Sequence, residues 1–520
     1  MIKEVSFSLT PEAASDEWQV KKTAALKAGI DPGQVKGFII TRKSLDARHK
    51  QIRVNLAVRL STEENEHLKD IKPLILRDVS KSPEVIIIGA GPAGLFAALR
   101  LCELGLRPVI LERGRNISER KRDIARISRE HIIDPDSNYC FGEGGAGTFS
   151  DGKLYTRSQK RGNNQRVLEL FVHFGAPENI LYESHPHIGS DKLPAIISSM
   201  RKSILDAGGL ILFNKRVTDI ISDKSGIKGV VTSGGERFMS DYVASAAGHS
   251  ARDIYALFHR KEIAITIKPF AMGVRVEHPR ELIDKIQYHG ADRGKYLPAA
   301  TYSLVAQVEG RGVWSFCMCP GGFIIPSATS QDEVVVNGMS ASARNSPWSN
   351  SGIVVEIRME DVVRSEGPGD LAGLELQHRL EQEAWKQGGS DQRAPAQRLS
   401  DFIEGRFSSS LPEASYFPGI SSSAIHEWLP EFINSRLRTG LRLFGKKMKG
   451  FVTSEAIVTG IESRTSSPVR ILRDEISLES INMKGLYPCG EGAGYAGGIL
   501  SSAVDGIRVA DAIAAENGLL

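Results

Sequence analysis

The clearest pattern of apolar residues lies between residues 84 and 113. Val85 to Ile88 is a β-branched run, which is typical of a strand buried on both faces. Ala93 to Leu104 contains strong helix formers and ends before Gly105. Pro108 to Leu111 is a second apolar run. The pattern predicts a strand, a helix and a second strand, as in the βαβ unit of a parallel sheet.

The N-terminal region contains a segment in which apolar and polar residues alternate. Ile52, Val54, Leu56, Val58 and Leu60 alternate with polar or small residues, which predicts a half-buried strand. With strands expected over 5–9 and 37–45 and a helix over 16–28, residues 1–80 are predicted to form a small α+β domain. The 37–60 hairpin is basic, and we interpret its charges as a solvated face rather than an RNA site.

A long central region carries short strand-like runs and one helical pattern. The strands are expected over 271–277, 312–316, 323–325 and 334–337, and the helix over 369–385. Residues 266–450 are therefore expected to form a β-rich α+β substrate or cap domain. Residues 386–425 are rich in Ser, Gly and Pro, so we expect poor order there.

The amino-acid composition argues against several classes of protein. The chain has 520 residues, 41% hydrophobic and 25% charged, which is ordinary for a globular protein of two or three domains. A net charge of +4 is too small to imply membrane or nucleic-acid binding. Five sparse cysteines and the absence of a signal-peptide pattern lead us to expect a cytoplasmic protein with reduced thiols. No metal site is expected.

Glycines punctuate the turn between the first strand and the helix. Gly89, Gly91 and Gly94 have the Gly-x-Gly-x-x-Gly spacing, with Pro92 and Ala93 opening the helix. Such a turn lets the backbone approach a pyrophosphate at a helix N-terminus. Glu112 and Arg113 end the second strand, where an acidic side chain accepts hydrogen bonds from ribose hydroxyls. These residues predict a dinucleotide site.

The last glycine-rich segment indicates which dinucleotide binds. Residues 485–513 read as a strand, a Gly-Glu turn, a glycine loop and a helix. They resemble the C-terminal flavin motif of FAD-dependent oxidoreductases of the glutathione-reductase-like superfamily. That resemblance implies FAD, with Glu491 near the ribityl or pyrophosphate part and a helix N-terminus beside the flavin ring. The residues implied in contact are Gly490, Glu491, Gly497, Gly498 and Ile499.

Two internal segments agree with this interpretation. Residues 241–252 resemble the strand and Ala-Gly turn by which these flavoproteins leave the FAD domain, which implicates Ala247 and Gly248. The loop over 137–154 is dense in glycine, and its ordering carries an entropic cost that favours cofactor contact over a mobile surface loop. Its candidate contacts are Gly145, Gly147, Thr148, Ser150, Gly152 and Lys153.

The chain as a whole resembles the bacterial uncharacterised FAD-dependent dehydrogenases, also called NAD/FAD-utilising dehydrogenases. The segments that carry this resemblance are 43–48, 141–153, 316–322, 462–468 and 491–499. It implies an α/β fold in which a Rossmann-like FAD-binding domain, with a parallel sheet flanked by helices, is built from residues 81–265 and 451–520. The substrate domain is inserted between them. The resemblance does not identify a substrate.

Candidates for the chemistry lie outside the glycine motifs. Cys317 and Cys319 form a Cys-x-Cys pair that could be a redox relay beside a flavin. In an extended strand their Cα atoms would lie about 7 Å apart, so a disulfide needs a turn. The alternative is two small, partly buried residues at a strand end.

Two arginines are also candidates. Arg275 shares a predicted strand face with Glu277, which favours a structural ion pair between them. Arg464 precedes the C-terminal flavin segment, and its guanidinium could hold an anionic substrate. His278 is interpreted as a hydrogen-bonded loop residue. The basic run over 436–449 is interpreted as a helix C-terminus rather than an RNA or NADPH phosphate site.

The sequence thus predicts a FAD-dependent oxidoreductase acting on an unknown small molecule. No second Gly-x-Gly-x-x-Gly turn follows the first, so NAD(P)H is a candidate only for transient electron donation. The His and Pro pattern of aromatic hydroxylases and the halogenase signature are absent, which lowers the rank of both classes. Two alternatives stay open: a flavoprotein that modifies tRNA, and a FAD-binding sensor without turnover. The sequence does not indicate an oligomeric state.

Overall fold

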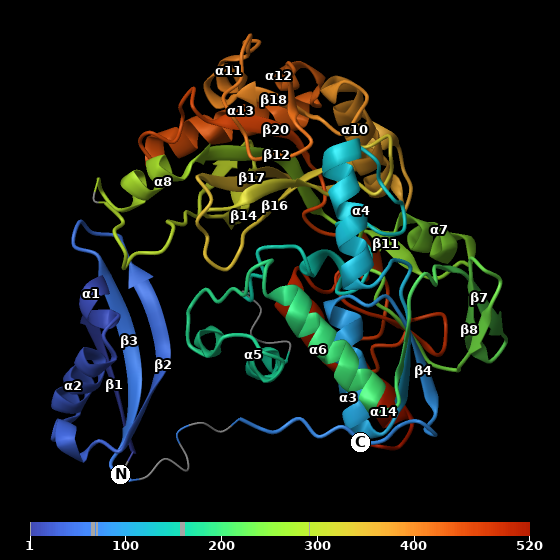
Figure 1. The fold of residues 1–520 in the computed structure, drawn as a ribbon. Helices are drawn as coiled ribbons and strands as arrows, with labels where there is room; N and C mark the ends of the chain where they lie inside the picture. Colours follow the sequence, from blue (N-terminus) through green and yellow to red (C-terminus); the bar gives the residue numbers. More distant parts are fainter. Residues whose placement is uncertain (1, 64–67, 69–70, 156–161, 291) are drawn as a thin grey trace.

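A computed structural model describes residues 2–63, 68, 71–155, 162–290 and 292–520. Figure 1 shows an N-terminal unit at the lower left, a unit with a parallel sheet at the lower right and a unit with a larger sheet at the top. The chain passes from the first to the second, continues to the third and returns to the second at its C-terminus (Figure 1).

The N-terminal unit is a three-stranded antiparallel sheet in the order β1-β3-β2, with its helices on one face. Val54, Leu56, Val58 and Leu60 are buried, so the alternation in the sequence marks the core face of β3. The elements are β1 (Ile2–Leu9), α1 (Pro11–Ala14), α2 (Glu17–Ala28), β2 (Gly37–Asp46) and β3 (Arg53–Ser61).

Acidic partners surround several of the basic side chains in this hairpin. Lys43 pairs with Glu183, Arg48 with Asp46, and Arg59 with Glu4. In α13 (Glu431–Lys447) two basic side chains are held by backbone instead, because Arg438 and Arg442 both donate to the Ile403 carbonyl.

The second unit contains a five-stranded parallel sheet in the order β22-β10-β4-β5-β6. Val85 and Ile87 of β4 contact a core shared with α3 and α14, while Ile86 and Ile88 contact a second core on the opposite face. The unit's strands are β4 (Glu84–Ile88), β5 (Arg107–Leu111), β6 (Leu210–Leu212), β10 (Val243–Ser245), β22 (Leu486–Pro488) and the antiparallel β7 (Val217–Asp223), β8 (Gly226–Thr232) and β9 (Arg237–Met239). The helices are α3 (Pro92–Leu104), α4 (Ile117–Glu130), α5 (Asn164–His173), α6 (Leu193–Asp206), α7 (Arg252–Arg260) and α14 (Ile499–Glu516).

Two distant segments of the chain meet in this unit. Strand β22 pairs with β10, which in turn pairs with β4, so the C-terminal segment joins the sheet of the first βαβ unit. Helix α14 packs so closely on α3 that a Cβ on Gly506 would lie 2.1 Å from the Ala93 carbonyl oxygen. The start of α3 and the start of α14 are therefore held near each other.

The third unit is built on a seven-stranded sheet in the order β13-β14-β17-β12-β20-β18-β19, antiparallel except for the β18–β19 pair. Its strands are β12 (Phe270–Pro279), β13 (Val305–Val308), β14 (Arg311–Cys319), β17 (Trp348–Ile357), β18 (Ala394–Arg398), β19 (Ile420–Ser422) and β20 (Ile457–Glu462). The accompanying helices are α8 (Arg280–Gln287), α9 (Met359–Glu366), α10 (Ala372–Gly388), α11 (Leu399–Glu404), α12 (Ile425–Trp428) and α13 (Glu431–Lys447). One short strand pair completes it, β15 (Phe323–Pro326) with β16 (Val336–Met339). Another, β11 (Ile265–Ile267) with β21 (Val469–Ile471), packs on the core of the second unit.

The expectation of poor order over 386–425 is wrong. Strand β18 lies between β20 and β19 in the large sheet, and Ala394 and Ala396 are fully buried. A ladder of backbone hydrogen bonds on both sides orders this polar segment, and such a ladder does not depend on apolar side chains.

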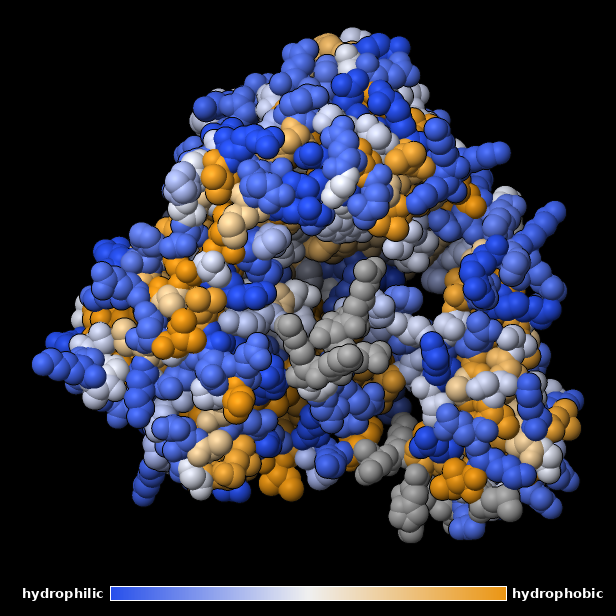
Figure 2. All heavy atoms as spheres, turned by 180° about the vertical axis from the view of Figure 1, so that it is seen from behind, coloured by the Kyte–Doolittle hydropathy of each residue, from blue (hydrophilic) through white to orange (hydrophobic). Residues whose placement is uncertain are grey.

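No helix among the described residues is long and apolar enough to cross a membrane. Seen from behind, most of the surface is polar, and hydrophobic residues appear in small groups (Figure 2).

Candidate functional site: a cavity between two helix N-termini

The turn after β4 begins the site. Gly89 has a φ of +102°, and a Cβ there would lie 2.7 Å from the Ala246 carbonyl oxygen. A Cβ on Gly94 would lie 2.0 Å from the Gly89 carbonyl oxygen, so this glycine lets the helix pack on the turn. Gly91 caps α3, and a Cβ there would meet only the Gly145 Cα, at 3.9 Å. The α3 N-terminus therefore faces open space, as an anion site requires.

Glu112 lies at the end of β5, buried, with its carboxylate holding two glycine-rich loops. Its Oε2 accepts from the Ala90 N–H at 2.8 Å, and its Oε1 accepts from the N–H groups of Gly114 and Gly142, both at 2.9 Å. A carboxylate has about four lone-pair sites, so it can still accept a hydrogen bond from a ribose hydroxyl.

The glycine-rich loop over 142–153 runs between the two helix starts. A Cβ on Gly145 would lie 3.1 Å from the Gly91 Cα, and a Cβ on Gly147 would lie 3.1 Å from Ile499. Thr148 turns away from the cavity, because its buried hydroxyl donates to the Glu143 carbonyl at 2.8 Å. The predicted cofactor contact of Thr148 is thus wrong, and its role is to hold the loop.

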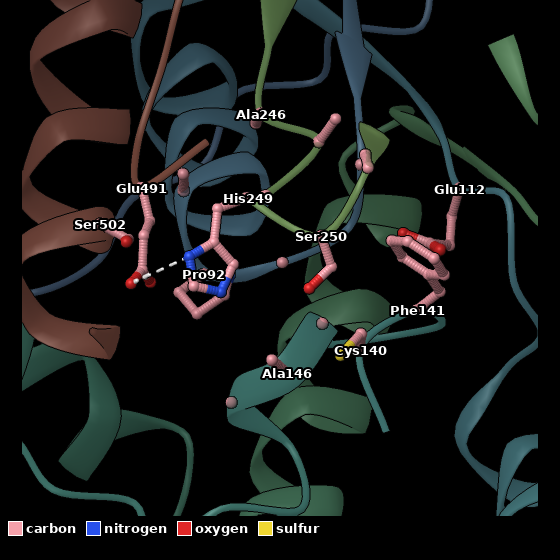
Figure 3. Close-up of a pocket in the computed structure, with 18 of the residues that line it drawn as sticks. Pro92, Glu112, Cys140, Phe141, Ala146, Ala246, His249, Ser250, Glu491 and Ser502 are labelled. Carbon is pink, nitrogen blue, oxygen red and sulfur yellow. Dashed lines mark ion pairs between the residues drawn. The ribbon is translucent and has the colours of Figure 1, made fainter. Parts of the chain in front are cut away.

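The C-terminal segment closes the other end. Gly498, with a φ of +98°, immediately precedes α14, and a Cβ there would have no other atom within 4 Å. Glu491 accepts from the Gly498 N–H at 3.2 Å, and its Oε1 lies 3.8 Å from His249 Nδ1 (Figure 3). That Nδ1 is buried and has no hydrogen-bond partner among the described residues. Burial lowers the pKa of His249, which favours the neutral imidazole.

These segments line a single cavity. The predicted cofactor residues found on its wall are Gly89, Gly91, Pro92, Ala93, Glu112, Arg113, Gly145, Gly147, Ser150, Gly152, Lys153, Ala247, Gly248, Glu491, Gly498 and Ile499. Gly94, Thr148, Gly490 and Gly497 do not line it. The cavity fits a dinucleotide such as FAD: an acidic side chain at one end, helix N-termini along it, Cβ-free walls and an unpartnered imidazole nitrogen.

Sequence reasoning missed a further part of the wall. Cys140, Phe141, Lys215, Arg216, Val217, Ser250 and Asp253 line the cavity, besides His249 and Ser502. The 215–217 segment follows β6 and reaches the site only through the pairing of β6 with β5, so no local pattern identifies it. His249 directly follows the predicted Ala-Gly turn and could have been found from that position.

Arg275 is fully buried, and its predicted ion pair with Glu277 is wrong. Its Nη1 donates to Glu462 Oε2 at 2.8 Å, and its Nη2 donates to the Cys317 carbonyl at 2.7 Å. Glu277 instead accepts from the backbone N–H of Ser415 at 2.8 Å and from its hydroxyl. Strand β12 is central in the sheet, so partners from other segments replace the neighbour along the strand.

Arg464 is also occupied, so its predicted role in holding an anionic substrate is wrong. Its Nη2 donates to Glu381 at 2.7 Å and to Glu333 at 2.9 Å, and its side chain is 6% exposed. Two buried carboxylates balance this guanidinium, and it does not line the cavity. His278 is buried on β12, where its Nε2 bonds the Phe451 carbonyl at 2.8 Å.

The two cysteines lie at the cavity rather than away from it. Cys317 lines the wall and Cys319 is fully buried beside it. Both sulfur atoms are close to Lys153, whose Nζ lies 3.7 Å from Cys317 Sγ and 3.6 Å from Cys319 Sγ. Among the described residues over 266–450, only Cys317 reaches the cavity wall.

Comparison with known proteins gives three family matches along the chain. Residues 82–135 match an FAD binding domain, residues 269–465 match "FAD-dependent protein, C-terminal domain-like", and residues 1–61 match a domain of unknown function. An uncharacterized protein of Clostridium beijerinckii is 39% identical over 513 residues, covering 95% of each chain. A thiamine thiazole synthase of Aeropyrum pernix is 29% identical over 183 residues, or 32% of this chain and 55% of its own.

Two solved structures illustrate more distant similarity. The flavin-dependent brominase Bmp2 has a TM-score of 0.37 at 15% identity, with 84% of this chain and 80% of that chain covered. A salicylate hydroxylase substrate complex has a TM-score of 0.36 at 14% identity, with 84% and 79% covered. At these TM-scores the similarity carries no conclusion about function.

Proposed function

Because this chain belongs to a family of FAD-dependent proteins, we propose that it is an oxidoreductase that holds FAD non-covalently and acts on a small molecule. The observation that carries the proposal is the meeting of two helix N-termini at one cavity. Pro92 and Ala93 come from the start of α3, and Gly498 and Ile499 from the start of α14. Bound FAD supplies two-electron transfer between a donor and an acceptor.

In this proposal, each part of the cavity wall binds a different part of FAD. Glu112 accepts from ribose hydroxyls, and the N–H groups at the start of α3 bind the pyrophosphate. The free Nδ1 of His249 is available to hydrogen-bond the cofactor. The positive end of α14 lies beside the flavin ring, where it stabilises negative charge on the reduced form. This two-segment arrangement also supports the finer assignment to the glutathione-reductase-like superfamily.

The inserted region over 266–450 supplies part of the cavity wall, through Cys317. We assign the substrate to this side, with residues 81–265 and 451–520 as the cofactor domain and 1–80 as a separate appendage. NAD(P)H would act here as a transient electron donor, because one dinucleotide turn of this type is present in the sequence.

Anaerobic mixing of the purified holoprotein with NADH or NADPH tests the proposal. We expect one of them to bleach the flavin absorbance, and a small-molecule oxidant to restore it. A flavin that dithionite reduces but that no donor from a cell extract reduces would contradict an oxidoreductase and favour a sensor. Co-purified RNA whose binding weakens steeply with salt would favour a tRNA-modifying enzyme instead.

A further inference from the structure

A β-bulge brings the two cysteine thiols together. Phe316 pairs with Gly352 of β17, but Cys319 pairs with Asn350, so β14 carries one extra residue between these pairs. Cys317 has a φ of +46°, in the left-handed region that a residue with a Cβ seldom adopts. The bulge is the turn that a Cys-x-Cys pair needs, because the Cys319 thiol folds back to donate to the Cys317 carbonyl at 3.3 Å and both sulfur atoms lie within 3.7 Å of the same Lys153 ammonium.

Positive charge surrounds this pair. The Lys153 ammonium lies within 3.7 Å of both sulfur atoms and 3.5 Å from Asp151 Oδ2. Burial alone would lower the pKa of Lys153, but the two thiols and Asp151 raise it, so the lysine stays charged. The hydrogen bond from Cys319, together with Lys153, holds the pKa of the Cys317 thiol well below its ordinary value. The arrangement therefore stabilises a Cys317 thiolate.

Arg275 fixes the bulge through a hydrogen bond to its backbone. Its Nη2 donates to the Cys317 carbonyl at 2.7 Å and lies 3.9 Å from Cys319 Sγ, and its Nη1 is anchored on Glu462. It is a positioning residue, since it holds the backbone on which both thiols sit.

The pair is linked to the start of α14 through the glycine-rich loop. Cys317 shares the cavity wall with Gly498 and Ile499, and the loop that carries Lys153 also carries Gly147, where a Cβ would lie 3.1 Å from Ile499. The opposite end, at Glu112, is where the ribose of the adenosine is expected. A thiolate at this position lies on the wall of the cavity assigned to the flavin.

We propose that Cys317 and Cys319 form a redox dithiol that exchanges two electrons with the bound flavin, an inference that rests on the proposed function. When the S–S bond forms, the Cys317 thiolate and the Cys319 thiol together lose two electrons and one proton. Oxidised flavin takes both electrons and that proton. The reverse step passes the electron pair from reduced flavin to the disulfide. Stabilisation of the thiolate by Lys153 favours the reduced pair, so reduced flavin is the electron source.

Anaerobic titration of the holoprotein with dithionite tests this inference. The oxidised wild type should take up four electrons per FAD, two for the flavin and two for the disulfide. Cys317→Ser and Cys319→Ser should take up two. Cys102→Ala is the matched control, because Cys102 is buried in α3 away from the cavity, and it should still take up four.

Alkylation followed by mass spectrometry gives a second readout that needs no variant. In the air-oxidised holoprotein the peptide containing both cysteines should resist alkylation until a reductant is added. A holoprotein that binds FAD, takes up two electrons and leaves both thiols open to alkylation would overturn the dithiol but not the proposed function. A protein that binds no FAD would overturn both.

Discussion

Arg473 and Asp505 form a buried two-point ion pair behind the cavity, with Nη1 donating to Oδ2 at 3.0 Å and Nη2 to Oδ1 at 2.7 Å. Their side chains are 3% and 6% exposed. Asp505 also accepts from the Gly490 N–H at 2.8 Å, so the pair ties α14 to the turn that carries Glu491. The C-terminal part of the cavity wall is thus positioned by an ion pair whose two residues do not line the cavity.

Asp505→Asn should destabilise the protein and weaken FAD binding. The change leaves the Arg473 guanidinium buried without its carboxylate, which costs about 3 kcal/mol in the free energy of unfolding. Urea unfolding and FAD titration measure the two effects. Asp511→Asn on the same helix is the control, because its partner Arg100 is 30% exposed and such a pair contributes less than about 1 kcal/mol. Equal losses in the two variants would contradict this account.

Glu277 should give the folded protein a distinct pH dependence. Burial raises the pKa of its carboxyl from 4.5 to about 7. Between these values the folded protein keeps a proton that the unfolded chain has released, so the stability from this group falls as the pH rises through that window. The fall is at most about 3 kcal/mol.

Chemical denaturation of wild type and Glu277→Gln across pH 4.5 to 7 measures this effect. The wild-type free energy of unfolding should decline relative to that of the variant, which has no proton to lose. Glu413→Gln is a control at an exposed glutamate two residues from Ser415, and it should follow the wild type. Parallel curves for wild type and Glu277→Gln would rule out a raised pKa.

Lys153→Met should raise the pH at which Cys317 reacts. The Cys319 hydrogen bond and the ammonium lower the pKa of the Cys317 thiol, so its thiolate persists to lower pH than an ordinary cysteine's. Without the ammonium the thiolate forms only at higher pH. Rates of iodoacetamide labelling at Cys317 against pH, measured on the protein without FAD, report the change. Lys192→Met, at an exposed lysine, should leave the profile unchanged, and an unchanged profile in Lys153→Met would contradict the pairing.

The elements of the fold and site that could be predicted from the sequence are those determined by local sequence pattern. The β4–α3–β5 unit, the strands of the N-terminal unit and helix α10 follow from apolar periodicity, turn glycines and helix stops. The segments that line the cavity could be predicted for the same reason, since Gly-rich turns and a terminal acidic residue are contiguous in the sequence.

The predictions that were wrong concern residues whose partners lie far away in the sequence. Arg275 pairs with Glu462 of β20, and Arg464 pairs with Glu381 of α10. The ion-pair partner of each arginine comes from a distant segment, so the spacing of charges along one strand does not predict it. The polar composition of 386–425 gave no sign of strand β18, whose order comes from its neighbours in the sheet. The close approach of Lys153 to both cysteines likewise appears only in the folded structure.

FAD affinity measured by calorimetry for wild type and Gly91→Val tests the central claim most directly. Gly91 has a φ of −76°, and a Cβ there would meet one atom, at 3.9 Å, so the backbone accepts a side chain, and the methyl groups of valine fill space proposed for the cofactor. We predict one FAD per wild-type chain, and a loss of affinity of at least about a hundredfold in Gly91→Val. The unfolding midpoint of the protein without FAD should not change. A wild-type protein that takes up no FAD, or a variant that binds it equally well, would contradict the account.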